Sequence, residues 1–375
     1  MTSILRPGAL LLLSIIVSAA IAQSSSGPNP PQPVFDATWP QMPLPFKWEF
    51  EGITGLTVDQ NDVIWVLQRP GDYDADPIFG GANNRTNYAS LDPPTASCCL
   101  KPEAVLAFSQ DGRLLHHWDL ADEISGHLIL ADSDGNIWVG TNTISKYTTQ
   151  GRLLAKMSRA ENLRPDPGDV APETPLIVGR VEGGFLDEDA RELYVTDSYL
   201  HGRVLVFDMD TFAFKRGWGA YGKPLAEIGL ADHPPYTPGN HAAPDFRGHV
   251  TVALSADGEV YVADRNSNRI QVFTKGGGFL REFVVAPETL GRGSTGGLAF
   301  SPRPDQTYLY VPDIMNNVVW IVNRADGETL GHFGYFGRNG GGFHWLHMVA
   351  TDSSGNVYTG EVDTGKRVQR FVVTR

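Results

Sequence analysis

Short runs of alternating apolar and polar residues recur along the chain as a repeated unit. Clear copies begin at Gly126, Gly248 and Leu346 and read GHLILADSDGNIWV, GHVTVALSADGEVYV and LHMVATDSSGNVYT. Each has a short apolar strand, a polar turn with Asp or Ser followed by Gly, and a second strand of the IWV or VYV type. A polar loop and a third strand such as RIQVF follow, and most copies add a fourth strand after a turn with Gly. The pattern predicts four-stranded antiparallel units.

Three looser copies begin near Ile53, Gly179 and Ser294, and the outer strands of the first are displaced to about Pro102. Six such units predict an all-β fold, a six-bladed β-propeller. Helical arrays share this period, but no unit has apolar residues at helical spacing over a dozen positions. The last unit shows three strands, so we expect PFKWEF from Pro45 to supply the missing outer strand and close the ring.

The N-terminus has the composition of a secretory signal. Residues 1–22 combine a basic residue, Arg6, with an apolar run and a small-residue ending, Ala20-Ile21-Ala22. Residues 23–40 begin with only Ser, Gly, Pro, Asn and Gln, which predicts a flexible leader before a propeller over 41–375. No later segment approaches the roughly 20 apolar residues of a membrane span. We therefore expect a secreted or periplasmic protein without a membrane anchor.

Charge and cysteine content narrow the partners and the stabilising chemistry. The net charge is −13, which makes nucleic acid a poor partner. The two cysteines are adjacent, Cys98 and Cys99, and form either a strained vicinal disulfide or two free thiols.

Histidines occupy matching positions in alternate units. His127, His249 and His347 stand at the beginning of the first strand in units two, four and six, and the other units carry none there. Because first strands line the channel of a propeller, the three imidazoles are predicted to converge on the axis and hold one metal with an open position. Such a site suits zinc, although iron or copper could also bind. A single histidine at a strand start is usually a hydrogen-bonding group, but the alternation favours ligation.

The ends of the second strands reach the same face and add three candidate site residues. Arg69 ends the second strand of unit one, Tyr199 that of unit three, and Arg265 that of unit four. Two guanidiniums beside a metal predict a small anionic substrate or a peptide C-terminus, held through its carboxylate. A tyrosine beside a cation is expected to have a lowered pKa and to act as a general base.

Each residue also has a structural interpretation. Arg265 could pair with Asp264 or Asp197, and Tyr199 could pack on a neighbouring blade.

Because these motifs follow one another in this order along the sequence, the chain resembles NHL-repeat propellers and, among them, the peptidyl-α-hydroxyglycine α-amidating lyases. The matching segments include GLTVDQNDVIWVLQR, VTDSYLHGRVLVF and VADRNSNRIQ, and the resemblance runs from about Gly52 to Phe371. It implies a zinc held by the three histidines, Tyr199 as the catalytic tyrosine, and arginines at the site. It implies cleavage of an N-acyl-α-hydroxyglycine, a carbinolamide, to an amide and glyoxylate. The family's structural calcium is doubtful here because Met348 stands where an Asp is usual.

Two other functions fit the same scaffold. One is a non-catalytic NHL propeller that binds a protein or glycan, because a fold does not fix a function. The other is a metal-dependent hydrolase or lactonase, although such propellers usually ligate their metal with acidic and amide side chains.

Overall fold

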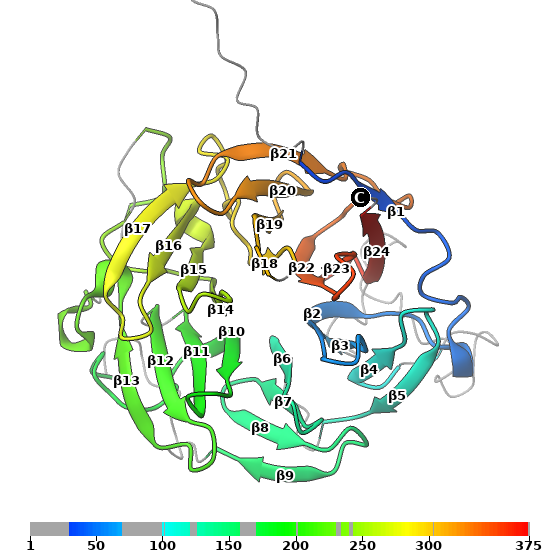
Figure 1. Ribbon diagram of the computed structural model, residues 1–375, viewed down its shortest axis with the longest axis horizontal. Coiled ribbons are helices and arrows are strands. Elements are labelled where there is room, and N and C mark those ends of the chain that lie inside the picture. The colour runs from blue at the N-terminus through cyan, green and yellow to red at the C-terminus, as the bar shows by residue number, and fades with distance from the viewer. Residues whose placement is uncertain are drawn as a thin grey trace, which may run out of the picture. The chain divides into compact units, whose positions relative to one another are not determined.

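The computed structural model describes residues 30–69, 100, 102–120, 126–157, 170–199, 202–229, 234–239, 243–302 and 304–373. Residues 31–375 form one compact unit of six four-stranded sheets, which Figure 1 shows as a ring of blades. The predicted six-bladed all-β propeller is confirmed. The predicted signal segment, residues 23–29 of the leader, and Cys98 and Cys99 lie outside the described residues.

Blades 1 to 5 pair their strands in chain order from the centre outwards, and blade 6 adds the N-terminal β1 as its outermost strand. Blade 1 consists of β2 (Gly52–Val58), β3 (Ile64–Arg69), β4 (Val105–Phe108) and β5 (Leu114–Trp118). Blade 2 consists of β6 (Leu128–Ala131), β7 (Ile137–Gly140), β8 (Ile144–Tyr147) and β9 (Leu153–Lys156). Blade 3 consists of β10 (Arg180–Asp187), β11 (Glu192–Ser198), β12 (Arg203–Asp208) and β13 (Phe214–Trp218).

The second half of the ring repeats this order. Blade 4 consists of β14 (Val250–Leu254), β15 (Val260–Asp264), β16 (Arg269–Phe273) and β17 (Phe279–Val284). Blade 5 consists of β18 (Ala299–Phe300), β19 (Tyr308–Asp313), β20 (Val318–Asn323) and β21 (Thr329–Phe333). Blade 6 consists of β22 (Leu346–Thr351), β23 (Val357–Glu361), β24 (Arg367–Val373) and β1 (Pro33–Phe35). Helical structure among the described residues is limited to short 3-10 turns at Pro45–Lys47, Ala220–Gly222, Leu225–Glu227 and Arg265–Ser267.

The ring is closed by an N-terminal strand, but by a different one from that predicted. β1 pairs antiparallel with β24, and Phe35 lies opposite Phe371. The segment from Pro45 is instead a 3-10 turn in which Phe46 has a φ of 59°. The prediction of a strand there was wrong because this left-handed residue cannot continue a β ladder, and Pro45 offers no N–H. The closing strand falls within the predicted leader, where its three residues are too few to show an alternating pattern.

The turn motif of the repeat has a structural explanation. Oδ1 of Asp132 accepts the backbone N–H of Asn136 at 2.7 Å, and its Oδ2 accepts Nε1–H of Trp138 at 2.9 Å. In blade 6, Asp352 accepts the hydroxyl of Tyr358 at 3.0 Å in the same way. The carboxylate therefore pins the tight turn to the strand that follows it.

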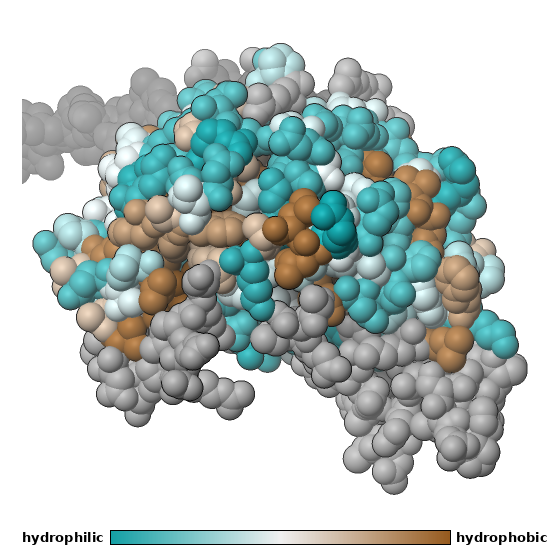
Figure 2. Space-filling model, turned by 90° about the horizontal axis from the view of Figure 1, so that it is seen from below, coloured by the Kyte–Doolittle hydropathy of each residue, from teal (hydrophilic) through white to brown (hydrophobic). Residues whose placement is uncertain are grey.

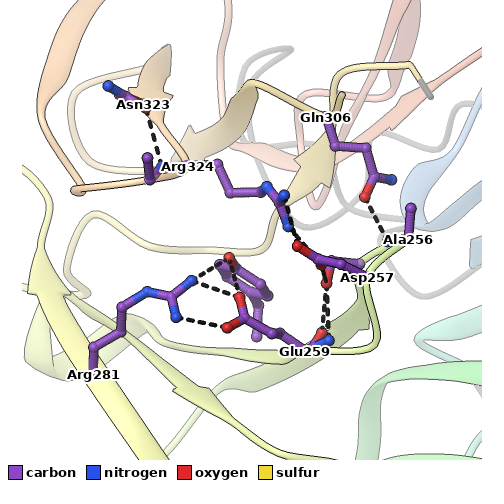
Figure 3. Close-up of polar contacts among 10 residues, drawn as sticks. Ala256, Asp257, Glu259, Arg281, Gln306, Asn323 and Arg324 are labelled. Atoms are coloured by element: carbon purple, nitrogen blue, oxygen red, sulfur yellow. Dashed lines mark hydrogen bonds and ion pairs between the residues drawn. The ribbon is translucent and has the colours of Figure 1, made fainter. Parts of the chain in front are cut away.

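Apolar side chains fill the spaces between blades, and charged pairs tie the blade edges. Figure 3 shows Arg324 of blade 5 held by both oxygens of Asp257 in blade 4, at 2.8 and 2.9 Å. Within blade 4, Arg281 holds both oxygens of Glu259, at 2.8 and 2.6 Å. In the edge-on view of Figure 2, hydrophilic residues cover most of the coloured surface and hydrophobic residues form separate patches. No helix among the described residues is long and apolar enough to cross a membrane.

Candidate metal centre

The three histidines singled out from the repeat lie together at the centre of the ring. His127 directly precedes β6, His249 directly precedes β14, and His347 is the second residue of β22. All three are buried, with 7%, 0% and 4% of their surface exposed. The ring of His347 lies 5.5 Å from that of His127 and 4.8 Å from that of His249, measured between centroids. The inner strands of alternate blades therefore bring the three imidazoles into one buried cluster.

A fourth buried group, Glu182 of β10, belongs to the same cluster. Its Oε2 lies 2.7 Å from Nδ1 of His127 and 2.9 Å from Nδ1 of His249. Glu182 was not predicted, because alignment of the repeat units places the neighbouring glycines, Gly183 and Gly184, at the position where units two, four and six carry a histidine. A β-bulge between Val181 and Gly184 shifts the register here, and a bulge is not visible in an alternating pattern.

The donor set of this cluster fits a metal ion. His127, Glu182 and His347 each offer a ligand atom, and these atoms lie within 4.8 Å of one another. Nδ1 of His347 and Oε1 of Glu182 are buried without a hydrogen-bond partner among the described residues, and the buried Nδ1 atoms of His127 and His249 both face the same oxygen of Glu182. Buried polar atoms without partners are costly, so a cation among them would remove a substantial penalty. The buried His/Glu/His group could therefore bind a metal.

Hydrogen bonds around His249 strengthen this argument. Its Nε2 lies 2.7 Å from the carbonyl oxygen of Gly296, which can only accept, so Nε2 carries the ring proton. Nδ1 is then an acceptor that lies 2.9 Å from the carboxylate of Glu182, and a cation bound to both atoms would stabilise this contact. Burial lowers the pKa of His249 and lowers that of His347 well below its usual range, which disfavours a proton as that cation.

His127 is constrained by an arginine. Its Nε2 lies 2.9 Å from Nη2 of Arg69, and a guanidinium can only donate. A neutral His127 accordingly keeps its proton on Nδ1, where it faces Glu182. Ligation through that nitrogen would displace this proton, so we expect metal uptake to release it.

A cavity of about 310 Å³ opens above the cluster, and three predicted site residues line it. Arg69, Tyr199 and Arg265 share the lining with His127 and His347. The remaining lining residues are Arg180, Arg292, Ile314, Val362 and Asp363. Arg180 and Arg292 were not predicted, because neither lies at the end of a second strand: Arg180 begins an inner strand and Arg292 lies in a connection between blades.

The structural alternative for Arg265 is wrong. Asp264 pairs with Arg269 at 2.9 Å, and Asp197 pairs with Arg203 at 2.8 Å. Arg265 is 7% exposed, and its backbone N–H donates to the carbonyl oxygen of His249 at 3.2 Å. Burial lowers the pKa of its guanidinium, and nearby Arg292 acts in the same direction. A buried cation of this kind favours an anionic ligand.

Tyr199 lies in the cavity lining, but its pKa shift is opposite to the one expected. It follows β11 with a φ of 70°, and its backbone N–H donates to the carbonyl oxygen of Gly248 at 3.0 Å. Partial burial of the phenol and the charge of Glu182 raise its pKa, and they outweigh the opposing effect of Arg265. The phenol is therefore protonated at neutral pH. With 46% of its surface exposed, Tyr199 is not packed away between blades.

A second, smaller cavity lies on the opposite side of the cluster. It has a volume of about 100 Å³, and its lining includes His127, Glu182, His347 and Met348. Most of the other lining residues are apolar or glycine, such as Leu56 and Ile129, and Glu182 is the single carboxylate among the described residues there. The thioether of Met348 is a poor calcium ligand, so this cavity gives no support for the calcium of the resembling family.

Two family models match single repeat units of the chain. The NHL repeat family matches residues 250–273, and the two component regulator propeller family matches residues 121–143. The chain is a six-bladed β-propeller, and one of its units is similar to the NHL repeat.

A more particular similarity is to one amidating enzyme. The chain is 24% identical over 246 residues to peptidyl-glycine alpha-amidating monooxygenase B of Xenopus laevis. The match covers 63% of this chain and 25% of that protein, so the chain spans about a quarter of its relative's length.

Solved structures resemble the chain at low sequence identity. A structural genomics protein of unknown function from Bacteroides thetaiotaomicron superposes with a TM-score of 0.53 and 14% identity, covering 87% of this chain and 70% of the other. Virginiamycin B lyase from Staphylococcus aureus gives a TM-score of 0.46 and 12% identity, covering 87% of each chain.

Proposed function

We propose that the chain is a metal-dependent lyase of the peptidyl-α-hydroxyglycine amidating type, which cleaves an N-acyl-α-hydroxyglycine to an amide and glyoxylate. The observation that carries the proposal is a buried His/Glu/His group at the base of a cavity that also contains Tyr199 and four arginines. Distant similarity to an amidating monooxygenase supports the same reaction class. The predicted signal segment supports export to the cell exterior or periplasm.

The metal would be zinc, held by His127, His249 and His347 with Glu182 beside them. A bound zinc ion supplies Lewis acidity and positive charge at the base of the cavity. The remaining chemistry belongs to residues of this chain.

Arg69 and Arg265 bind the substrate carboxylate and fix its orientation. They come from opposite blades, 1 and 4, and both line the cavity beside His127 and His347. Charge-assisted hydrogen bonds from guanidiniums hold a carboxylate well, and the burial of Arg265 strengthens them.

Tyr199 moves the proton. In the reaction the substrate hydroxyl loses its proton, the carbon–nitrogen bond breaks with its electron pair going to nitrogen, and the departing amide nitrogen gains a proton. Since its raised pKa keeps the phenol neutral, Tyr199 gives its own proton to that nitrogen while it accepts the hydroxyl proton. The tyrosine is regenerated in the same step.

The test measures glyoxylate and bound metal in the same purified protein. Incubation with α-hydroxyhippurate should release benzamide and glyoxylate in equal amounts, and the protein should hold about one zinc per chain. His249→Ala should lose both, whereas His332→Ala, on the outer strand β21, should lose neither.

Other outcomes lead to the alternatives. Stoichiometric zinc without glyoxylate release would support the metal site and contradict the proposed substrate. The metal-dependent hydrolase would then be the favoured function. Protein without zinc would contradict the proposal and favour a non-catalytic propeller.

A further inference from the structure

Nine arginines among the described residues are paired with carboxylates. The pairs are Arg113–Asp111, Arg191–Asp210, Arg203–Asp197, Arg216–Glu192, Arg269–Asp264, Arg281–Glu259, Arg324–Asp257, Arg367–Glu361 and Arg370–Asp36. Figure 3 shows two of them in bidentate contact. These arginines have internal partners and need no ligand.

Arg180 and Arg292 differ from that set. Both are exposed, both line the 310 Å³ cavity, and neither forms an ion pair with a carboxylate that the structure describes. Arg180 is the first residue of β10 in blade 3, and Arg292 lies between β17 and β18, at the entry to blade 5. They therefore flank Arg265 of blade 4 on either side.

Local contacts position the two side chains. The guanidinium of Arg292 lies over the ring of Trp345, 5.0 Å from its centroid. Such stacking orients a guanidinium and leaves its N–H groups free to donate at the edge. Arg180 pairs through its backbone with Ser198, the residue before Tyr199, so β11 fixes its position at the cavity wall.

The cavity holds more positive charge than one carboxylate requires. Four arginines line it, and Asp363 is the single acidic residue among the described lining residues. This excess occurs in a chain whose net charge is −13. Arg69 and Arg265 are sufficient for the carboxylate of a hydroxyglycine, so the other two cations are unaccounted for.

We propose that Arg180 and Arg292 bind a second anionic group of the substrate, so that the preferred substrate is an N-acyl-α-hydroxyglycine whose acyl part carries a carboxylate. This inference rests on the proposed function, because it places the first carboxylate on Arg69 and Arg265. The second carboxylate belongs either to a dicarboxylic acyl group or to an acidic residue near the end of a peptide. In both cases the same charge-assisted hydrogen bonds recognise it.

The test is a binding measurement that does not depend on turnover. The two probes are N-(4-carboxybenzoyl)glycine and its carboxamide, N-(4-carbamoylbenzoyl)glycine, which lack the α-hydroxyl and differ in one anionic group. Calorimetry with the metal-loaded protein should show about 10-fold tighter binding of the dicarboxylate. Raising the salt concentration should reduce this preference, since the two arginines are exposed.

A double variant assigns the preference to the two arginines. Arg180→Gln with Arg292→Gln should bring the ratio of the two affinities to about one and leave carboxamide binding within about 2-fold of wild type. Arg113→Gln, which alters an exposed arginine of blade 1, should change neither affinity. An acidic dipeptide analogue in place of the benzoyl probe then distinguishes a peptide from a dicarboxylic acyl group.

The outcomes separate this inference from the proposed function. Equal binding of the two probes, abolished by Arg265→Gln, would overturn the second subsite and leave the lyase intact. Tighter binding of the dicarboxylate without glyoxylate release from any hydroxyglycine would keep the subsite and overturn the reaction. Binding of neither probe would overturn both.

Discussion

The two cavities that meet at the histidine cluster differ in almost every property. The larger one, about 310 Å³, is lined by four arginines and Tyr199, whereas the smaller one, about 100 Å³, is lined mainly by apolar residues and glycine. Both contain His127 and His347, so the cluster forms the boundary between them. The charged and polar side chains therefore gather on one side of the cluster, where first strands begin and second strands end, and the other side is mainly apolar.

Removing a buried imidazole should have the largest effect. His347→Ala deletes a side chain that faces both cavities, and we expect loss of most of the bound metal and a fall in kcat/KM of at least about 10³-fold. Elemental analysis and a glyoxylate assay measure the two effects. Full metal content in His347→Ala would contradict a role of His347 in holding the metal.

Removing the buried cation of the larger cavity should come next. For Arg265→Gln we expect about a 10² to 10³-fold fall in kcat/KM with metal retained, because a charge-assisted contact to the substrate is lost. Arg265→Lys should recover little, since a lysine cannot make a bidentate contact. Steady-state kinetics tests both variants, and equal activity of Arg265→Gln and wild type would remove the arginine from the site.

Tyr199 should have a smaller effect, with a characteristic pH dependence. Tyr199→Phe should lower kcat by about 10²-fold without changing the metal content. Because the pKa of Tyr199 is raised above its usual value of 10, the neutral phenol persists through neutral and mildly alkaline pH. Activity that requires this phenol should therefore decline only above about pH 10. A decline near pH 7 to 8 that vanishes in Tyr199→Phe would contradict this assignment.

The smallest effect is expected on the other side of the cluster. Met348→Leu preserves the volume and apolar character of the smaller cavity, so activity should stay within about 2-fold and stability within about 1.5 kcal/mol. Added calcium should not raise Tm, because a thioether stands where a carboxylate would be needed. Thermal unfolding with and without calcium measures this. A large calcium-dependent rise would show that the smaller cavity is a second ion site.

The repeat predicted the ring and the histidines because both follow from strict periodicity. Each inner strand begins at the same point of its unit, so His127, His249 and His347 had to meet if the blades formed. Glu182 was not predicted because a β-bulge breaks the sequence period at that point of blade 3. Arg180 and Arg292 were not predicted because their exposure to the cavity depends on how three blades are arranged. No single sequence motif contains that arrangement.

Two further differences have local physical causes. The closing strand β1 has only three residues, and a segment that short contains too little pattern to distinguish it from a leader. The lowered pKa expected for Tyr199 followed from the effect of the neighbouring cation alone. Burial and the unforeseen charge of Glu182 reverse the direction.

Anomalous diffraction from crystals of the purified protein, recorded at the zinc absorption edge, would locate the metal itself. We expect one strong peak among His127, Glu182, His249 and His347, about 2.0–2.3 Å from the ligand atoms. No peak in a zinc-supplemented crystal, or a peak only in the smaller cavity beside Met348, would contradict it.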